Sequence, residues 1–140
     1  MYRILVAVDG SERADRAARF AIDLARRVGD AQLHLVNVQD PVDESQTHGL
    51  GRDAIRQHRG SIAAATASTA KALAERAGVR CSFDWHFGDP ARVLADIASS
   101  TQCNVLVMGT QGAGAIQSLL LGSVAQSTLH LSSVPVALVK

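Results

Sequence analysis

The apolar residues of this chain fall into short runs that alternate with longer segments in which they recur every three or four positions. The first run, residues 4–8, is wholly apolar and stops at Asp9, Gly10 and Ser11. Strands buried on both faces have this pattern, which is typical of a parallel sheet between helix layers. Further strands are predicted at residues 33–38, 79–87, 105–108 and 135–139. Because 79–87 is the least apolar of them, we expect it at an edge of the sheet.

Two long segments have the spacing of amphipathic helices. The first begins at Ser11 and Glu12, ends at Gly29, and has an apolar stripe of Ala17, Ala21, Leu24, Ala25 and Val28. The second ends at Gly78 and has a stripe of Ile55, Ile62, Thr66, Thr69, Leu73 and Ala77. Gly60 lies inside this second segment, where glycine weakens a helix, so the helix could break in two there.

A third helix is predicted after Gly88, Asp89 and Pro90, and a last one from Gly122 to about residue 131. Residues 42–52 are polar and glycine-containing, and we expect a mobile loop there. The alternation of strands and helices through residues 1–140 predicts a single α/β domain. Its five-stranded parallel sheet would be doubly wound, with helices on both faces and right-handed crossovers.

Composition narrows the possible partners and compartments. The net charge is +1, which gives no electrostatic argument for binding nucleic acid or an anionic membrane surface. No apolar run is long enough to span a bilayer, and the N-terminus does not have the pattern of a secretory signal. Cys81 and Cys103 form no disulfide framework and no metal-ligand pattern, so we expect two reduced, largely buried thiols and a cytoplasmic protein.

Two segments that leave the predicted strands have the chemistry of a phosphate site. They are Asp9-Gly10-Ser11 and the glycine-rich stretch that starts at Gly109, continues through Gly112 and Gly114, and reaches Gly122-Ser123. Ligands of open parallel sheets bind beyond the carboxyl ends of the strands, where glycines let backbone N–H groups approach phosphate oxygens. A helix that begins at Gly122 adds the positive end of its dipole, and the Ser123 hydroxyl adds a donor.

The standard phosphate motifs are absent. A P-loop needs a lysine after its second glycine, and the chain has only Lys71 and Lys140. A dinucleotide fingerprint that began at Gly112 would need glycine where Gln117 stands.

The spacing Gly109-x2-Gly112-x9-Gly122-Ser123 resembles the G-x2-G-x9-G-[ST] pattern of the universal stress protein family, in its ATP-binding subclass. The first strand with Asp9-Gly10-Ser11, the stretch 119–125 and the segment 134–136 are also similar to that family. The resemblance implies a Rossmann-like, HUP-type sheet of strand order 3-2-1-4-5 that binds ATP, or AMP or ADP, with Mg²⁺. It implies nucleotide-binding roles for Ala7, Val8, Asp9, Val38, Met108, Gly109, Gly112, Gly122, Ser123 and Val124. It further implies a homodimer that pairs through residues 136–139.

The chain departs from many relatives at Gln111, Ala113 and Ala115, where they have a basic residue in the glycine loop. Whether a triphosphate is preferred over AMP or ADP is therefore open. We also expect that only a bound ligand would oppose a side chain at Gly122. Asp9 has a second interpretation as an ordinary residue at the start of a helix, because aspartate is a common cap.

Three functions remain open on the sequence. The first is a regulatory protein that responds to stress, binds an adenine nucleotide and hydrolyses it slowly or not at all. The second is a slow ATP-hydrolysing or adenylyl-transferring enzyme, for which Arg52 or Arg56 would have to supply a cation. The third is an interaction protein that binds no nucleotide. Arg52, Arg56 and Arg59 lie at helical spacing and are either a basic lid or a solvated face. No histidine, catalytic residue or metal ligand is assigned, and the downstream protein partner is unknown.

Overall fold

The computed structural model of the protein describes residues 1–43, 45, 49–112 and 121–140. In these residues strands and helices alternate in the order β1 (Tyr2–Ala7), α1 (Glu12–Val28), β2 (Ala31–Gln39), α2 (Arg52–Arg76), β3 (Arg80–Phe87), α3 (Pro90–Ser100), β4 (Val105–Gly109), α4 (Ser123–Leu131) and β5 (Val136–Val139). All neighbouring strands are parallel, and their order is β3-β2-β1-β4-β5. The predicted fold is confirmed, including the edge position of the third strand. Part of the loop expected at 42–52, residues 44 and 46–48, lies outside the described residues.

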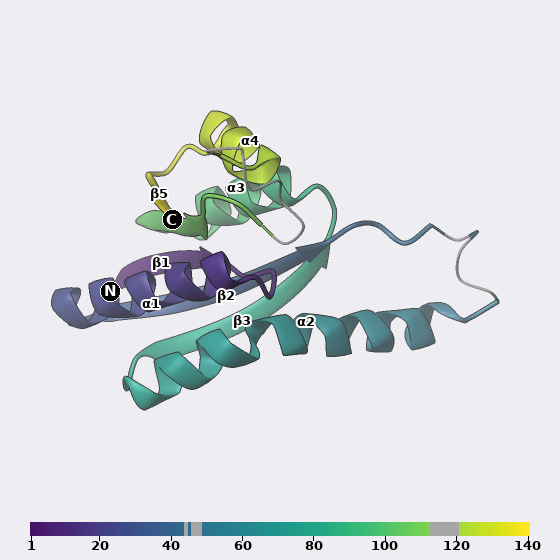
Figure 1. Cartoon of the computed structure of the whole chain (residues 1–140), viewed down its shortest axis with the longest axis horizontal. Helices are drawn as coiled ribbons and strands as arrows, with labels where there is room; N and C mark the ends of the chain where they lie inside the picture. Colours follow the sequence, from purple (N-terminus) through teal and green to yellow (C-terminus); the bar gives the residue numbers. More distant parts are fainter. Residues whose placement is uncertain (44, 46–48, 113–120) are drawn as a thin grey trace.

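The helices cover the two faces of the sheet in pairs. Alternate residues of β1 belong to two different hydrophobic clusters, one on each face of the sheet. Ile4 and Val6 pack with α1 and α2, whereas Leu5 packs with α3 and α4. The two helix pairs can be followed in Figure 1, where α3 and α4 lie together beside β4 and β5. This two-faced burial explains why the first strand is a continuous apolar run.

Helix α1 begins and ends where the sequence predicts. The Ser11 hydroxyl accepts a hydrogen bond from the Ala14 amide at 3.1 Å, which caps the first turn. Gly29 ends the helix with a φ of 89°, a conformation that glycine adopts without strain. Apart from Ile22, the buried residues of the helix are alanines, which allow the helix axis to approach the sheet closely. Val28, expected in the buried stripe, is 45% exposed because it lies beyond the sheet contact.

Helix α2 differs from the expectation in two ways. It runs without a break through Gly60, and its first turns project beyond the sheet (Figure 1). The predicted buried stripe is correct only in part: Leu73 and Ala77 pack against the core, but Ile62 is 41% exposed, and the fully buried residues are Ala63, Ala67, Ala70 and Ala74. Alanines spaced by three and four residues allow the backbone of α2 to lie close to β2 and β3, and larger apolar residues would hold it away.

Trp85 of β3 explains why the helix continues through Gly60. A Cβ atom at Gly60 would lie 3.5 Å from the Trp85 ring, an ordinary van der Waals distance, and the Arg56 guanidinium lies over the same ring at 5.4 Å. Trp85 in turn contacts Phe87 edge to face. These contacts cover the helix at its weakest residue.

Replacing Gly60 with alanine is therefore expected to raise the free energy of unfolding by about 0.5–1 kcal/mol, because alanine has the higher helix propensity and space exists for its methyl group. Urea denaturation followed by the fluorescence of Trp85, the sole tryptophan of the chain, measures this. A destabilised Gly60→Ala variant would contradict the close but unstrained contact between α2 and β3.

The remaining sequence predictions concern membranes and thiols. Among the described residues, no helix is long and apolar enough to cross a membrane. Both cysteines are free, and Cys103 is buried as expected, but Cys81 is exposed because it lies on the edge strand β3.

Candidate functional site

A cavity of about 680 Å³ opens at the carboxyl ends of β1, β2 and β4. The strand order reverses between β1 and β4, which is where ligands of open α/β sheets bind. The structure brings all ten residues that the sequence singled out to the wall of this one cavity: Ala7, Val8, Asp9, Val38, Met108, Gly109, Gly112, Gly122, Ser123 and Val124. Its volume is in the range of small-molecule sites.

Asp9 meets the glycine segment across the cavity. One carboxylate oxygen, Oδ1, accepts a hydrogen bond from the Ser11 amide at 2.9 Å, so Asp9 does shape the turn into α1. The other oxygen, Oδ2, would lie 2.7 Å from a Cβ atom at Gly112. The interpretation of Asp9 as a residue of the helix start and its place in the cavity wall are therefore compatible. Gly112 has to be glycine for these two segments to approach so closely.

Gly122 has a packing role that the sequence did not indicate. Its amide donates a hydrogen bond to the Thr110 carbonyl at 2.7 Å. A Cβ atom there would lie 3.3 Å from Gln111 Cα and 3.4 Å from the Thr110 oxygen. The expectation that only a ligand would oppose a side chain at Gly122 is thus wrong, because the backbone of Thr110 and Gln111 already lies at the limit of van der Waals contact.

The start of α4 faces the same cavity. Its N-cap residue is Gly122, and no side chain caps it, whereas Ser11 and Asp89 cap α1 and α3. The first amides of an α-helix have no intrahelical acceptor and concentrate the positive end of the helix dipole. The Ser123 hydroxyl lies in the cavity wall next to them. Together these groups form a neutral set of hydrogen-bond donors suited to an anionic oxygen.

Gln111 provides a polar atom without a partner among the described residues. The residue lines the cavity and is only 5% exposed, and its Oε1 atom is buried and accepts no hydrogen bond from any described residue. Leaving such an acceptor unpaired costs about 1–3 kcal/mol. The atom is also shielded from solvent, so the side chain would have to rotate before a ligand could donate a hydrogen bond to it.

One side of the cavity is apolar. Val36, Val38, Leu94, Met108 and Ala125 line it, and all five also belong to the hydrophobic cluster beneath α3 and α4. This wall is therefore the open end of the core, which holds it rigidly. A flat apolar ring could be buried against it without leaving polar groups unpaired.

The opposite side is polar and contains residues that the sequence analysis missed. The buried amides of Asn37 and Gln39 form a chain: Asn37 Nδ2 donates to the Val8 carbonyl at 2.8 Å, and Gln39 Nε2 donates to Asn37 Oδ1 at 3.1 Å and to the Arg59 carbonyl at 2.9 Å. The chain ties the end of β1 and helix α2 to β2. A signal existed, since positions 33, 35, 37 and 39 share one face of the strand, and two polar residues at the end of a buried face indicate a site.

The three arginines of α2 divide between different surroundings. Arg59 lines the cavity, and its guanidinium lies 3.3 Å from Gln39 Oε1. Arg56 instead lies over Trp85, and Arg52 is exposed at the first turn of α2. Neither Arg52 nor Arg56 is among the described residues that line the cavity.

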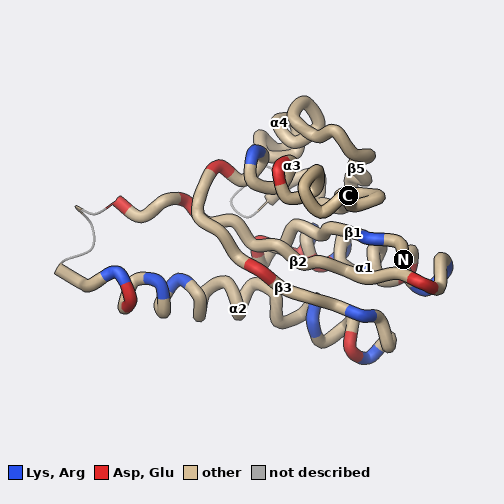
Figure 2. The backbone as a smooth tube through the Cα atoms, turned by 180° about the vertical axis from the view of Figure 1, so that it is seen from behind, with Lys and Arg blue, Asp and Glu red and all other residues tan. Residues whose placement is uncertain are grey.

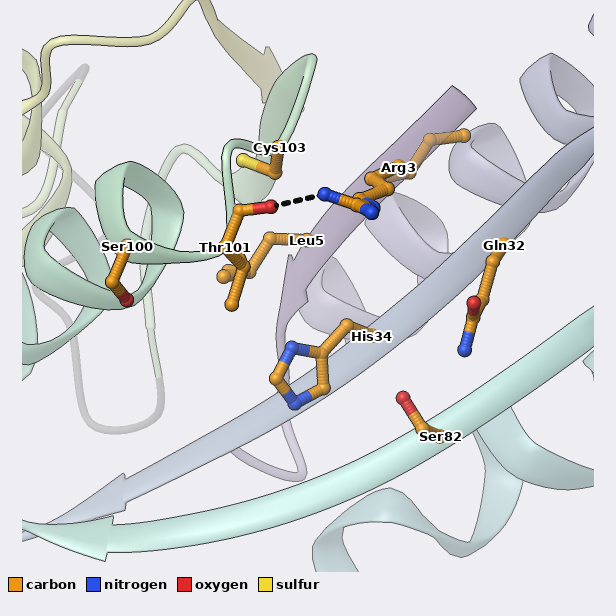
Figure 3. Close-up of a pocket in the computed structure, with 9 residues that line it drawn as sticks. Arg3, Leu5, Gln32, His34, Ser82, Ser100, Thr101 and Cys103 are labelled. Atoms are coloured by element: carbon orange, nitrogen blue, oxygen red, sulfur yellow. Dashed lines mark hydrogen bonds between the residues drawn. The ribbon is translucent and has the colours of Figure 1, made fainter. Parts of the chain in front are cut away.

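A second, smaller cavity of about 340 Å³ lies near the amino ends of β1, β2 and β3 (Figure 3). Its two basic side chains, Arg3 and His34, already have partners in the protein. The Arg3 guanidinium donates to the Thr101 carbonyl at 2.9 Å, and the His34 ring lies 2.8 Å from Asp84 Oδ2. These groups are used in holding α3 and β3 to the sheet, and the larger cavity is the better candidate for a ligand site.

The chain matches a family model over residues 1–140, that of the universal stress protein family. Among curated proteins, a universal stress protein of Thermus aquaticus is 33% identical over 98% of this chain and 97% of its own length. A universal stress protein of Methanocaldococcus jannaschii is 30% identical over 99% of this chain and 81% of its own length.

Solved structures have the same fold. The protein MJ0577 superimposes with a TM-score of 0.85 at 23% identity, over 99% of this chain and 95% of the other. A universal stress protein in complex with cAMP has a TM-score of 0.75 at 24% identity, over 99% and 97%. One from Archaeoglobus fulgidus in complex with dAMP has a TM-score of 0.70 at 24% identity, over 100% and 98%. At this level of identity the likeness bears on the fold alone.

Proposed function

The chain belongs to the universal stress protein family, and on this premise we propose that it is a regulatory protein of the stress response that binds an adenine nucleotide in the cavity at the carboxyl ends of its strands. The observation that carries the proposal is that Asp9 and the fixed positions of the glycine motif, Gly109, Gly112, Gly122 and Ser123, all line one cavity. Relatives of the same fold in complex with cAMP and dAMP support it.

The chemistry of the cavity suggests how the nucleotide lies. The adenine ring would be buried against the apolar wall, with its edge meeting the backbone of Val38 at the end of β2. The ribose and phosphates would then reach Asp9, Gly112 and the start of α4. This arrangement uses each side of the cavity for the part of the ligand that it fits.

We propose that ATP, ADP and AMP all belong to the class of ligands, with hydrolysis slow or nil. Arg59 is the only basic residue among the described residues that line the cavity, and no histidine lines it to act as a base. Mg²⁺ would be carried by the nucleotide phosphates, because the described residues include no cluster of three or more histidine, cysteine, aspartate or glutamate side chains that could hold a metal. Weak ATP hydrolysis or adenylyl transfer is the alternative.

Dimerisation and compartment complete the proposal. Val136–Val139 forms an edge strand of half-buried apolar residues, and Leu129 and Leu131 of α4 are exposed nearby in sequence. An apolar edge is protected when it pairs with a second copy, so we propose a homodimer through β5. Light scattering that found a monomer at micromolar concentrations and above would contradict it.

A reducing compartment such as the cytoplasm is proposed because both cysteines are free.

Calorimetric titration of the nucleotide-stripped protein tests the proposed ligand. AMP, ADP and ATP, with and without Mg²⁺, would be compared with GTP. Binding of at least one adenine nucleotide, with GTP excluded, is the expected result, since the apolar wall recognises the base. If no adenine nucleotide binds at millimolar concentration, the interaction protein that binds no nucleotide becomes the leading function.

Replacing Ser123 with alanine is expected to weaken nucleotide binding by about 1 kcal/mol, roughly fivefold in Kd, which is the value of one hydrogen bond. The matched control is Ser99→Ala on α3, an exposed serine outside the cavity wall. An unchanged Kd for Ser123→Ala in the same calorimetric assay would exclude the hydroxyl from the phosphate contacts.

A further inference from the structure

The wall of the cavity carries little positive charge. Among the described lining residues, the charged side chains are the carboxylates of Asp9 and Asp40 and the guanidinium of Arg59, so negative charge exceeds positive by one. Arg59 is also partly committed, because its guanidinium lies 3.3 Å from Gln39 Oε1. The described residues of the cavity wall therefore have no excess of positive charge with which to bind a multiply charged anion.

The glycine segment cannot correct this balance. Between Asp96 and Lys140 the sequence has no aspartate, glutamate, lysine or arginine, so the whole stretch from Gly109 to Ser123 is free of them. Figure 2 shows the consequence, since α4 and β5 are drawn entirely as uncharged residues. The donors at this end of the cavity are backbone amides, one hydroxyl and a helix dipole worth roughly half a positive charge.

Because the hydrogen-bond donors are neutral and the wall is net negative, the first phosphate group and the later ones should contribute differently to the affinity. The start of α4 can accept one phosphate group through its amides and Ser123, as helix N-termini commonly do. Each further phosphate adds about one negative charge without a new cation to meet it among the described lining residues, and the carboxylates of Asp9 and Asp40 already make that lining net negative. Phosphate number should therefore govern affinity at this site.

We infer that this cavity selects adenine nucleotides by phosphate charge, and that it binds adenosine monophosphates, linear or cyclic, more tightly than ADP or ATP when no divalent cation is present. The inference rests on the proposed adenine-nucleotide site and adds to it the class of nucleotide preferred. Asp40 is a residue that sets this preference from the rim, and Arg59 opposes it.

Affinities measured by calorimetry in EDTA test the inference directly. AMP and cAMP are expected to bind at least about tenfold more tightly than ATP. Raising the salt concentration should narrow the difference by improving ATP binding, because salt screens like-charge repulsion between exposed groups. Binding of ATP in EDTA as tightly as AMP would overturn the inference and leave the proposed function standing, whereas absence of all adenine-nucleotide binding would overturn the proposed function itself.

Two variants with a matched control locate the effect. Asp40→Asn keeps the size of an exposed side chain and removes one negative charge, so it should lower the Kd for ATP about two- to fivefold more than the Kd for AMP. Arg59→Gln should shift the same ratio in the opposite direction. Asp23→Asn, at an exposed position of α1 outside the cavity wall, should leave the ratio unchanged. Equal effects of Asp40→Asn and Asp23→Asn on the ratio would overturn the role of Asp40.

Discussion

Replacing Gly112 with alanine should lower nucleotide affinity by at least about tenfold while changing the free energy of unfolding by less than about 1 kcal/mol. The added Cβ atom would lie 2.7 Å from Asp9 Oδ2, which is too close for real atoms, so the Asp9 side chain has to move out of its place in the cavity. Gly112 is exposed and its φ is not in the left-handed region, so the backbone accepts alanine. Calorimetric titration and urea denaturation together separate the two effects.

Gly51→Ala is the matched control for this variant. Gly51 has a φ of −67°, a Cβ atom added there would meet nothing within 4 Å, and the residue lies outside the cavity wall. The affinity of Gly51→Ala for nucleotide should equal that of the parent. If Gly112→Ala binds nucleotide as well as Gly51→Ala does, the close approach of Asp9 and Gly112 is not part of the nucleotide site.

The largest loss of stability is expected from Leu106→Ala, at about 2–5 kcal/mol. Leu106 is 0% exposed in β4, the strand that joins β1 to β5, and it lies in the hydrophobic cluster beneath α3 and α4. Removing most of its side chain forfeits burial and leaves a cavity that the surrounding sheet cannot fill. Since small domains are stable by about 5–15 kcal/mol, this one change would remove a large share. Urea denaturation measures it.

Leu50→Ala provides the comparison for the core variant, because Leu50 is 59% exposed and buries little apolar surface. Its expected effect is within about 0.5 kcal/mol. A loss below about 1 kcal/mol for Leu106→Ala would mean that the cluster repacks easily. The same cluster supplies the apolar wall of the cavity through Val36, Leu94 and Met108, so such plasticity would also weaken the argument for a rigid base-binding wall.

Local patterns predicted most of the fold correctly because they depend on neighbouring residues. The run 4–8 reads as a strand buried on both faces, and the structure buries it between two clusters. Ser11 and Gly29 mark the ends of α1 through bonds and dihedral angles that lie within a few residues. The weak apolarity of 79–87 placed β3 at an edge because an edge strand with an incompletely covered face needs fewer apolar residues.

Other features could not be predicted, since they depend on contacts between distant segments. The predicted stripe of α2 includes Leu73 and Ala77, which do pack against the core, but not the buried Ala63 and Ala67, because the close approach of the helix to the sheet favours alanine over larger apolar residues. The continuity of α2 through Gly60 depends on Trp85 of another element. The need for glycine at position 122 also depends on such a contact, because the backbone of Gln111 lies beside it.

The sequence by itself determined the alternation of elements and the family resemblance, because periodicity, turn chemistry and motif spacing are properties of the chain. Through that resemblance it also indicated ten of the residues that line the cavity. Only the tertiary structure decided how these residues work together. It placed Asp9 beside Gly112 and buried the Oε1 atom of Gln111 without a partner among the described residues. It also placed Arg59, rather than Arg52 or Arg56, in the cavity wall. The distances within a site, its burial and its net charge depend on segments that are far apart in the chain, and these segments come together only when the chain folds.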